Sequence, residues 1–411
     1  MSNLILFICF ICPFVVCNVN CFSQHSIDAV ANNEVVHEIM LEDKSNGDLS
    51  FLKTVVGNKR IVLIGEEGHR VPEFNELNTQ IISFLHKELG FNILIYESGF
   101  NELACVSFLR DTIESETAMN TTLHGVWRTS SVIPQFEIQK QDSNFYVFGI
   151  DFPSSACKRS SYYFYNIINN KSHETANDFL AIDTTMFSFL INQVNCEKII
   201  NDSEKEAAYN SLKSEGLEKT NIYNNVLLSI TKGNNNYNKL DSLFTTRAII
   251  NRIAYIKWLT DEKRSFRYRD SIMFSNLEWY INEVFPNEKF IVIAHNAHIS
   301  KKYNQYKGSS LGELIANKNS NEYMVILKNY FSGYNKAGGD SVKTNIFVEY
   351  DLNSMTNNDV SYFDLNRIAN NNFSVKKHLK RKKYVGGVGK GKILELAEGI
   401  ILFKKVTLSN E

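Results

Sequence analysis

The stretch 61–99 constrains the fold more than any other part of the chain. It opens with an apolar run of β-branched character at 61–64 that stops at a glycine, as a buried parallel strand does. Pro72 then suits the first turn of a helix, and apolar residues keep helical spacing through 77–89. A second apolar run follows at 91–96. The sequence therefore predicts a β-α-β unit, and with it a parallel sheet.

Ionisable side chains stand at the ends of four predicted strands, the two above and those at 145–150 and 290–294. Ligands of open α/β sheets bind at the carboxyl ends of the strands, so side chains far apart in sequence can meet there. Taken singly, such a histidine is more often a hydrogen-bonded structural residue, and such an acid more often forms a turn or a cap. Their recurrence favours a functional site. The side chains concerned are Glu66 and His69, Glu97, Asp151, and His295 and His298.

The rest of the chain is expected to complete one α/β domain from residue 24 to residue 411, with a central, mainly parallel sheet flanked by helices. A long polar segment with helical periodicity, about 155–285, is interpreted as a helical insertion. The segment 112–140 is expected to form a loop over the site, and the basic end of the chain, about 374–411, a solvated tail. Two short elements are also predicted, a lead-in helix at 33–41 and a strand at 344–348.

The N-terminal run 4–17 is apolar apart from Pro13. Such a run is too short to span a bilayer and fits the apolar core of a secretory signal. We expect cleavage near Ser23, giving residues 1–23 as the signal peptide and an exported protein that is periplasmic or envelope-associated. A buried first helix is the alternative. No later segment is long and apolar enough for an integral membrane protein.

The charge and the cysteines exclude two further classes. The formal net charge of −1 provides no basic field that would attract nucleic acid. Beyond residue 21 only Cys105, Cys157 and Cys196 remain, which is too few for a disulfide scaffold.

A set of motifs, in order through roughly residues 50–335, resembles the erythromycin esterase family. The combination is specific, although no single motif is. The resemblance implies a lactone or ester hydrolase of α/β build with a helical insertion, and brings antibiotic resistance as an expectation. The motifs are Gly65-Glu66-x-x-His69, Gly149-Ile150-Asp151, Arg269-Asp270-x-x-Met273 and Ala294-His295-Asn296-Ala297-His298.

The resemblance also implies roles for individual residues. It puts the family's proposed general base on His69, its carboxylates on Glu66 and Glu97, and its histidine pair on His295 and His298. The family usually has glycine after the first histidine, where this chain has Arg70. A bulky cation beside the base is expected to alter substrate fit. The candidate substrate-binding residues are Arg70, Asp151 and His124, the last in the expected loop.

The expected mechanism starts with His69, oriented by Glu66 or Glu97, which deprotonates a water molecule that attacks an ester carbonyl. A cationic or imidazole side chain then stabilises the oxyanion or protonates the leaving alkoxide. The stretch Gly308-Ser309-Ser310-Leu311-Gly312 has the Gly-x-Ser-x-Gly spacing, but Ser310 is expected to cap a helix there, so a nucleophile elbow and a covalent serine intermediate are not expected. No cofactor is expected, and the expected partner is a small-molecule ester or lactone. The candidates for the second role are His295, His298 and Arg269.

The same residues leave two alternatives open. The five acids and histidines assigned by the resemblance are also possible ligands of a divalent metal such as zinc. The chain could then be a metal-dependent hydrolase or a metal- or haem-binding envelope protein on the same fold. A third class is a non-catalytic envelope binding protein. Sensitivity to a chelator tests the first alternative, and a panel of esters tests the second.

Overall fold

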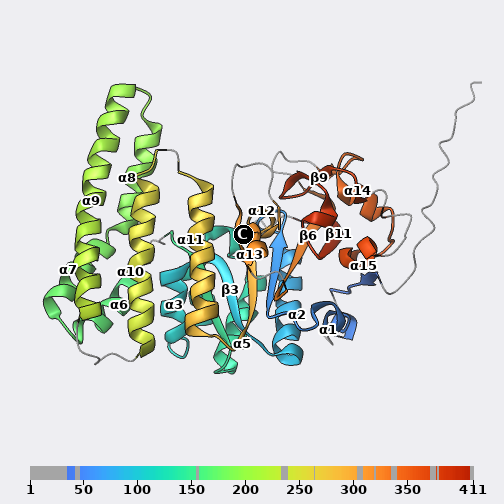
Figure 1. Cartoon of the computed structure of the whole chain (residues 1–411), viewed down its shortest axis with the longest axis horizontal. Coiled ribbons are helices and arrows are strands. Elements are labelled where there is room, and N and C mark those ends of the chain that lie inside the picture. Colours follow the sequence, from blue (N-terminus) through green and yellow to red (C-terminus); the bar gives the residue numbers. More distant parts are fainter. Residues whose placement is uncertain are drawn as a thin grey trace, which may run out of the picture.

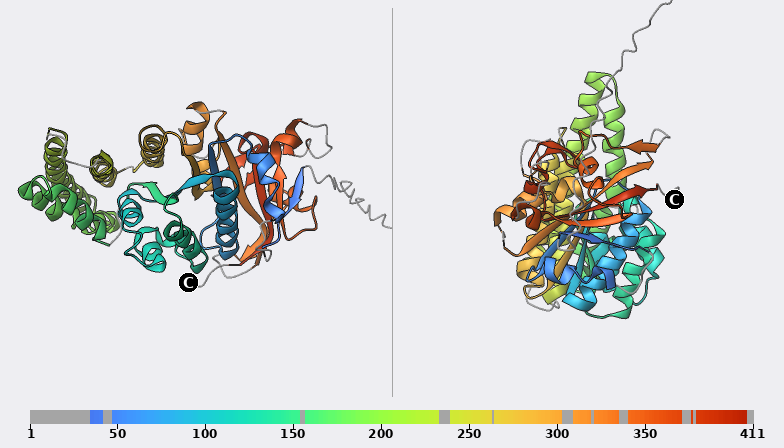
Figure 2. Two further views of the ribbon diagram at one scale, coloured as in Figure 1. Left: turned by 90° about the horizontal axis from the view of Figure 1, so that it is seen from below. Right: turned by 90° about the vertical axis from the view of Figure 1, so that its right-hand side faces the viewer.

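The structure is a computed structural model and describes residues 35–41, 47–153, 157–232, 239–262, 264–302, 309–318, 321–334, 340–370, 376 and 379–407. Within these residues a nine-stranded sheet, parallel from β11 to β4, has helices packed around it (Figures 1 and 2). The predicted α/β fold class is confirmed. The strand order is β1 (Val36–Glu38), β8 (Val360–Asp364), β11 (Gly399–Val406), β6 (Tyr323–Tyr334), β2 (Ile61–Glu66), β5 (Lys289–His295), β3 (Phe91–Gly99) and β4 (Tyr146–Asp151), with β7 (Asp340–Val342) beside β6.

The β-α-β unit has the form that the sequence predicts. The helix α2 (Pro72–Leu89) joins β2 to β3, with proline in its first turn and Gly90 in the left-handed conformation, at φ 70°, behind its end. Strand β5 lies between β2 and β3 and pairs in parallel with both. The register between β2 and β5 sets His295 opposite Glu66. Side chains from distant parts of the chain therefore end side by side.

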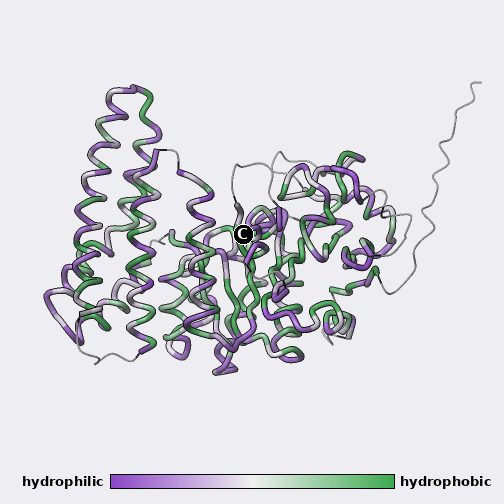
Figure 3. The backbone as a smooth tube through the Cα atoms, viewed as in Figure 1, coloured by the Kyte–Doolittle hydropathy of each residue, from purple (hydrophilic) through white to green (hydrophobic). Residues whose placement is uncertain are grey.

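The central strands are buried on both faces, which explains their continuous apolar runs. Successive side chains of a strand point to opposite faces. Along β2, Ile61 and Leu63 join the core that includes residues of α10 (Lys239–Leu259) and α11 (Phe266–Trp279). Val62 and Ile64 join the core on the α2 side. Figure 3 shows the hydrophobic strands in the middle of the molecule and helices that are hydrophilic along part of their surface.

A group of helices stands beside the β4 edge of the sheet (Figure 1, left). Arg252 of α10 is 1% exposed and ties this group together, since it binds Asp183 at 2.7 Å and Glu102 of α3 (Phe100–Phe108) at 3.2 Å. The described part of 155–285 is thus helical, as expected. Besides α10 and α11 its helices are α6 (Arg159–Asn169), α7 (His173–Asp183), α8 (Met186–Lys198) and α9 (Asp202–Lys232).

Three local predictions are wrong. The expected helix at 33–41 is the short edge strand β1, which pairs antiparallel with β8. The expected loop at 112–140 contains the helices α4 (Ser115–Thr122) and α5 (Ile133–Gln141). The expected strand at 344–348 is a turn with a single bridge from Phe347 to Tyr384, and the helix α14 (Val348–Asn353) begins at its last residue. Each is a short element whose state is set by its neighbours in space rather than by its own pattern.

The predicted solvated tail at about 374–411 is also wrong. Its described part contains β9 (Lys383–Val385), β10 (Gly389–Gly391) and β11, and β11 lies inside the main sheet between β8 and β6. The first five residues of β11 are buried. The basic residues at 376–383 led to the prediction of a tail, although an apolar run follows them in the sequence.

The predicted signal peptide, 1–23, and its cleavage near Ser23 lie outside the described residues. Among the helices that the structure describes, none is both long enough and apolar enough to cross a bilayer.

Candidate active site

The ends of β2, β5, β3 and β4 bring the predicted side chains to one edge of the sheet. A cavity of about 280 Å³ opens there. Five of the six predicted catalytic residues line it, namely His69, Glu97, Arg269, His295 and His298. The predicted convergence of distant strand ends is therefore what the structure shows. The remaining lining residues are Phe266, Arg267, Asp270, Ala297, Ser309 and Ser310.

His69 is paired with a buried carboxylate. Its Nδ1 lies 2.8 Å from Oε1 of Glu66, which is only 1% exposed. Burial raises the pKa of Glu66, and the bond to His69 opposes that rise. The His69 side chain is 38% exposed. A proton held on Nδ1 by the carboxylate leaves Nε2 as the ring atom that can accept a proton.

His295 caps a short helix and is held neutral. Its Nδ1 accepts a hydrogen bond of 3.1 Å from the backbone N–H of Ala297, in α12 (Asn296–Ile299). The proton is therefore on Nε2, which donates to the carbonyl oxygen of Glu67 at 3.1 Å. Burial lowers the pKa of His295 to about 4. Because both ring nitrogens of His295 are already in hydrogen bonds, this residue is better suited to positioning neighbouring groups than to transferring a proton.

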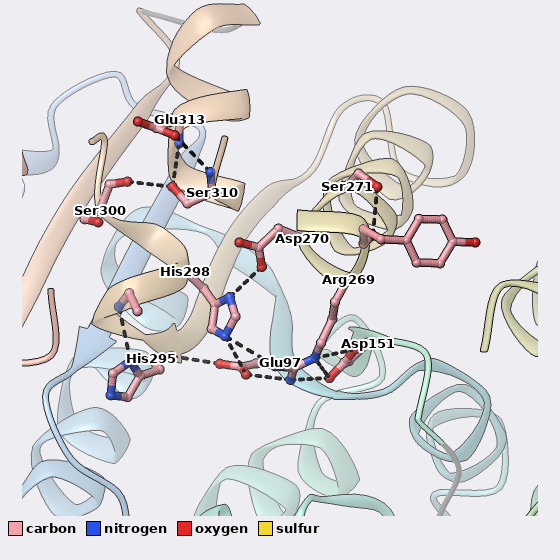
Figure 4. Close-up of polar contacts among 12 residues, drawn as sticks. Glu97, Asp151, Arg269, Asp270, Ser271, His295, His298, Ser300, Ser310 and Glu313 are labelled. Carbon is pink, nitrogen blue, oxygen red and sulfur yellow. Dashed lines mark hydrogen bonds and ion pairs between the residues drawn. The ribbon is translucent and has the colours of Figure 1, made fainter. Parts of the chain in front are cut away.

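His298 stands between two carboxylates. Its Nδ1 is 2.5 Å from Oδ1 of Asp270, and its Nε2 is 3.2 Å from Oε1 of Glu97 (Figure 4). Burial opposes a charge on this ring, but the two carboxylates more than offset it and raise the pKa of His298 to about 10. His298 is therefore a cation at neutral pH, in contrast to His295.

Arg269, from the first turn of α11, joins two strand ends. Its guanidinium lies 2.7 Å from Oε1 of Glu97 and 2.5 Å from Oδ2 of Asp151 (Figure 4). Burial would raise the pKa of both carboxyls, but the cation holds the pKa of Asp151 at about 2. With His298, it also holds the pKa of Glu97 well below its usual range. The four side chains form a closed, charge-compensated cluster.

The three predicted substrate-binding residues are not among those that line the cavity. Asp151 is fully buried against Arg269, and Nε2 of His124 lies 3.3 Å from Oδ2 of Asp151, the oxygen that Arg269 also binds. Both are therefore parts of the ion cluster. Arg70 is exposed and adopts φ 59°, a left-handed conformation that side chains other than glycine rarely adopt. This strain agrees with the glycine that the resembling family usually has there.

Sequence reasoning missed two residues that matter here. Asp270 holds His298, and it was visible as the residue after Arg269 in the quoted motif. Arg267 lines the cavity, but nothing in the sequence marked it.

The candidate metal ligands do not converge on one point. Within the described residues, no group of three or more His, Cys, Asp or Glu side chains is placed to hold an ion. Glu66 binds His69 and Glu97 binds His298, so the acids and imidazoles are used in pairs. In the part of the chain that the structure describes, these side chains are therefore bound to one another rather than grouped around one point.

A titration would separate the two histidines. We expect His298 to be doubly protonated and His295 neutral, with its proton on Nε2, at pH 7. The pKa of folded His298 lies above the roughly 6.5 of an unfolded histidine. Its charge therefore contributes stability fully below that value, and this contribution is lost as the pH rises through about 10. Two-bond ¹H–¹⁵N correlation spectra at pH 5, 7 and 9 measure both states, with His298→Gln to assign the signal. A His298 signal that titrates near pH 6.5 would contradict the ion cluster.

The fold and this cavity define an α/β enzyme with acid–base side chains gathered at the carboxyl edge of its sheet. The profile of the erythromycin esterase family matches residues 86–333, more than half of the sequence. The chain therefore belongs to the erythromycin esterase family and is a hydrolase of that family. This confirms the resemblance seen in the sequence.

Individual relatives are distant. The Bacillus subtilis (strain 168) protein YbfO is 23% identical over 323 residues, 72% of this chain and 70% of its own length. An erythromycin esterase type II of Escherichia coli is 20% identical over 338 residues, with 75% and 78% covered.

Two solved structures share the fold. A Bacillus cereus protein has a TM-score of 0.69 at 17% identity, covering 92% of this chain and 97% of its own. An erythromycin esterase mutant in its open conformation has a TM-score of 0.59 at 14% identity, with 90% and 97% covered.

Proposed function

We propose that this protein hydrolyses a carboxylic ester or lactone, using a water molecule that His69 deprotonates, without a covalent serine intermediate. One observation carries the proposal. The His69 imidazole, bonded to the buried Glu66, shares a cavity with the cationic His298. A base for water and a positive charge for the developing oxyanion are the two groups that direct ester hydrolysis needs.

Each residue of the site has a separate role in this mechanism. Glu66 keeps the proton of His69 on Nδ1 and stabilises the imidazolium that forms when Nε2 takes a proton from water. An electron pair of the water oxygen forms a bond to the carbonyl carbon, and the π pair of the C=O bond moves onto the carbonyl oxygen. His298 and Arg269 place positive charge beside that oxygen. When the tetrahedral intermediate collapses, the imidazolium of His69 returns its proton to the leaving alkoxide.

The test is a panel of alkyl esters and lactones, with products identified by mass spectrometry. We expect hydrolysis by the wild-type protein, no initial burst of alcohol, and no acyl adduct on the quenched protein. Activity should also persist after exhaustive dialysis against a chelator, because the acids and imidazoles at the site are paired with one another. An accumulated acyl adduct would contradict direct attack by water. Failure to cleave every member of the panel would overturn the proposed function.

A further inference from the structure

The start of α11 contributes one cation to the cavity that the mechanism above does not use. Arg267 lines the cavity together with Arg269 and Asp270. Arg267 and Asp270 are three residues apart in one helix, so they lie on the same side of it, about one turn apart. Asp270 holds His298. The Arg267 side chain therefore starts next to the residue that positions the cationic imidazole.

The other positive charges lining the cavity already have carboxylate partners. Arg269 is bound by Glu97 and Asp151, and His298 by Glu97 and Asp270. In the part of the chain that the structure describes, no carboxylate oxygen lies within 4.0 Å of the Arg267 guanidinium. Its Nη2 is shielded from solvent and has no hydrogen-bond partner.

An unpaired guanidinium nitrogen out of contact with water is unfavourable by itself. Structural arginines of this chain avoid this state, as Arg252 does with Asp183 and Glu102. The guanidinium is planar and always charged, and its fork of N–H donors matches the two oxygens of a carboxylate or phosphate. The missing partner of Arg267 is thus best supplied from outside the chain.

We propose that the substrate carries an anionic group, a carboxylate or a phosphate, close to its ester bond, and that Arg267 binds this group. This inference rests on the proposed ester hydrolysis. The cavity holds both the Arg267 side chain and His69, and its roughly 280 Å³ lies just below the range of ordinary ligand pockets. The anion and the scissile carbonyl must therefore be only a few bonds apart. Arg267 selects the substrate, while His69 acts on it.

The test compares esters that differ in one terminal group. Monoethyl succinate and ethyl butyrate share the same acyl chain, but the first ends in a carboxylate and the second in a methyl group. Ethyl 4-(phosphonooxy)butyrate provides the phosphate arm. We expect the wild-type kcat/KM for one of the anionic esters to exceed that for ethyl butyrate by roughly 10-fold or more. Which anionic ester is preferred identifies the source of the anion. The preference should shrink as the salt concentration rises, although less than for a fully exposed charge.

Variants locate the effect. Arg267→Gln should bring the ratio of anionic to neutral kcat/KM close to one, and Arg267→Lys should keep part of the preference. The matched control is Arg264→Gln, which removes the same charge three residues before Arg267. Arg264 binds Glu197 and does not line the cavity. This control should leave the ratio unchanged. Equal kcat/KM for anionic and neutral esters in the wild type would overturn the inference and leave the ester hydrolase intact.

A binding measurement separates this inference from the reaction itself. Succinate and inorganic phosphate are titrated into the wild-type protein and into Arg267→Gln by calorimetry. Binding of either anion to the wild type, lost in the variant, supports the anion site even if no ester of the panel is cleaved. Absence of binding in the wild type, or equal binding in both proteins, overturns it.

Discussion

Replacing His69 by Asn is expected to lower kcat for ester hydrolysis by roughly 10²- to 10⁴-fold, the usual contribution of a general base. Asparagine can still approach Glu66 but has no ring nitrogen to accept a proton from water. The side chain is 38% exposed, so its replacement opens no cavity in the core. The melting temperature should therefore stay close to that of the wild type. The measurement is kcat on a cleaved ester, together with thermal unfolding of both proteins.

The control for this variant is His173→Asn. His173 is exposed at the start of α7 and bonds only with Asn169 there, so the same change of atoms should leave kcat unaltered. If His69→Asn keeps turnover within a factor of a few of the wild type, His69 is not the base. The proposed mechanism would then fail even though the family assignment stands.

Much of this site could be predicted from the sequence, because it depends on local patterns. Apolar runs that stop at a glycine or an acid define the strands, and strands of a parallel sheet end at one edge. That reasoning brought His69, Glu97 and the pair in 295–298 to the same place, and the cavity lining agrees. Locating the site required no long-range contact to be known, whereas the order of the strands does not follow from these patterns.

The pairing of those groups could not be predicted in the same way. His69 has Glu66 as its partner rather than Glu97, because β5 lies between β2 and β3 and separates their ends. Asp151 was predicted to bind the substrate, but its carboxylate is already bound by the guanidinium of Arg269 in α11. These outcomes depend on which strands are neighbours and on where a distant helix begins. Arg269 and Asp151 are 118 residues apart in the sequence.

The C-terminal strand shows a different reason for failure. Composition averaged over 374–411 is basic, and a solvated tail follows from that average. The run 399–403 within it is apolar and buried, and it pairs with two strands of the main sheet. A short apolar run predicts a buried strand better than the charge averaged over the whole segment does.

The structure also divides the site into two parts of different character. Glu66 and His69 form a pair whose imidazole reaches the cavity, which suits a group that must gain and lose a proton. Glu97, Asp151, Arg269 and His298 form a cluster in which each charge meets its opposite. We interpret the first part as the working base and the second as a rigid, charge-balanced framework that keeps His298 and Arg269 beside the cavity.

Replacing Arg269 by Met should therefore destabilise the protein by about 3–5 kcal/mol at pH 7, as removal of one partner from a buried ion pair does. The variant leaves the carboxylates of Asp151 and Glu97 buried without their cation. In the wild type the cation keeps the pKa of Asp151 at about 2, below the usual 3.8 of an aspartate. The stability from this pairing is present above 3.8 and is lost as the pH falls through about 2. Urea unfolding at pH 7 and pH 3 should show a smaller difference between the two proteins at the lower pH.

The control is Arg247→Met, which removes an arginine whose hydrogen-bond partners, Asn276 and Ser275, are neutral. No carboxylate is stranded in this case. The loss of free energy of unfolding should then be about 1.5–3 kcal/mol, the scale of a hydrogen bond to a charged group, and nearly equal at both pH values. If the two variants lose the same free energy with the same pH dependence, the charges around Arg269 do not depend on one another. Its position between Glu97 and Asp151 would then have no part in holding the cavity together.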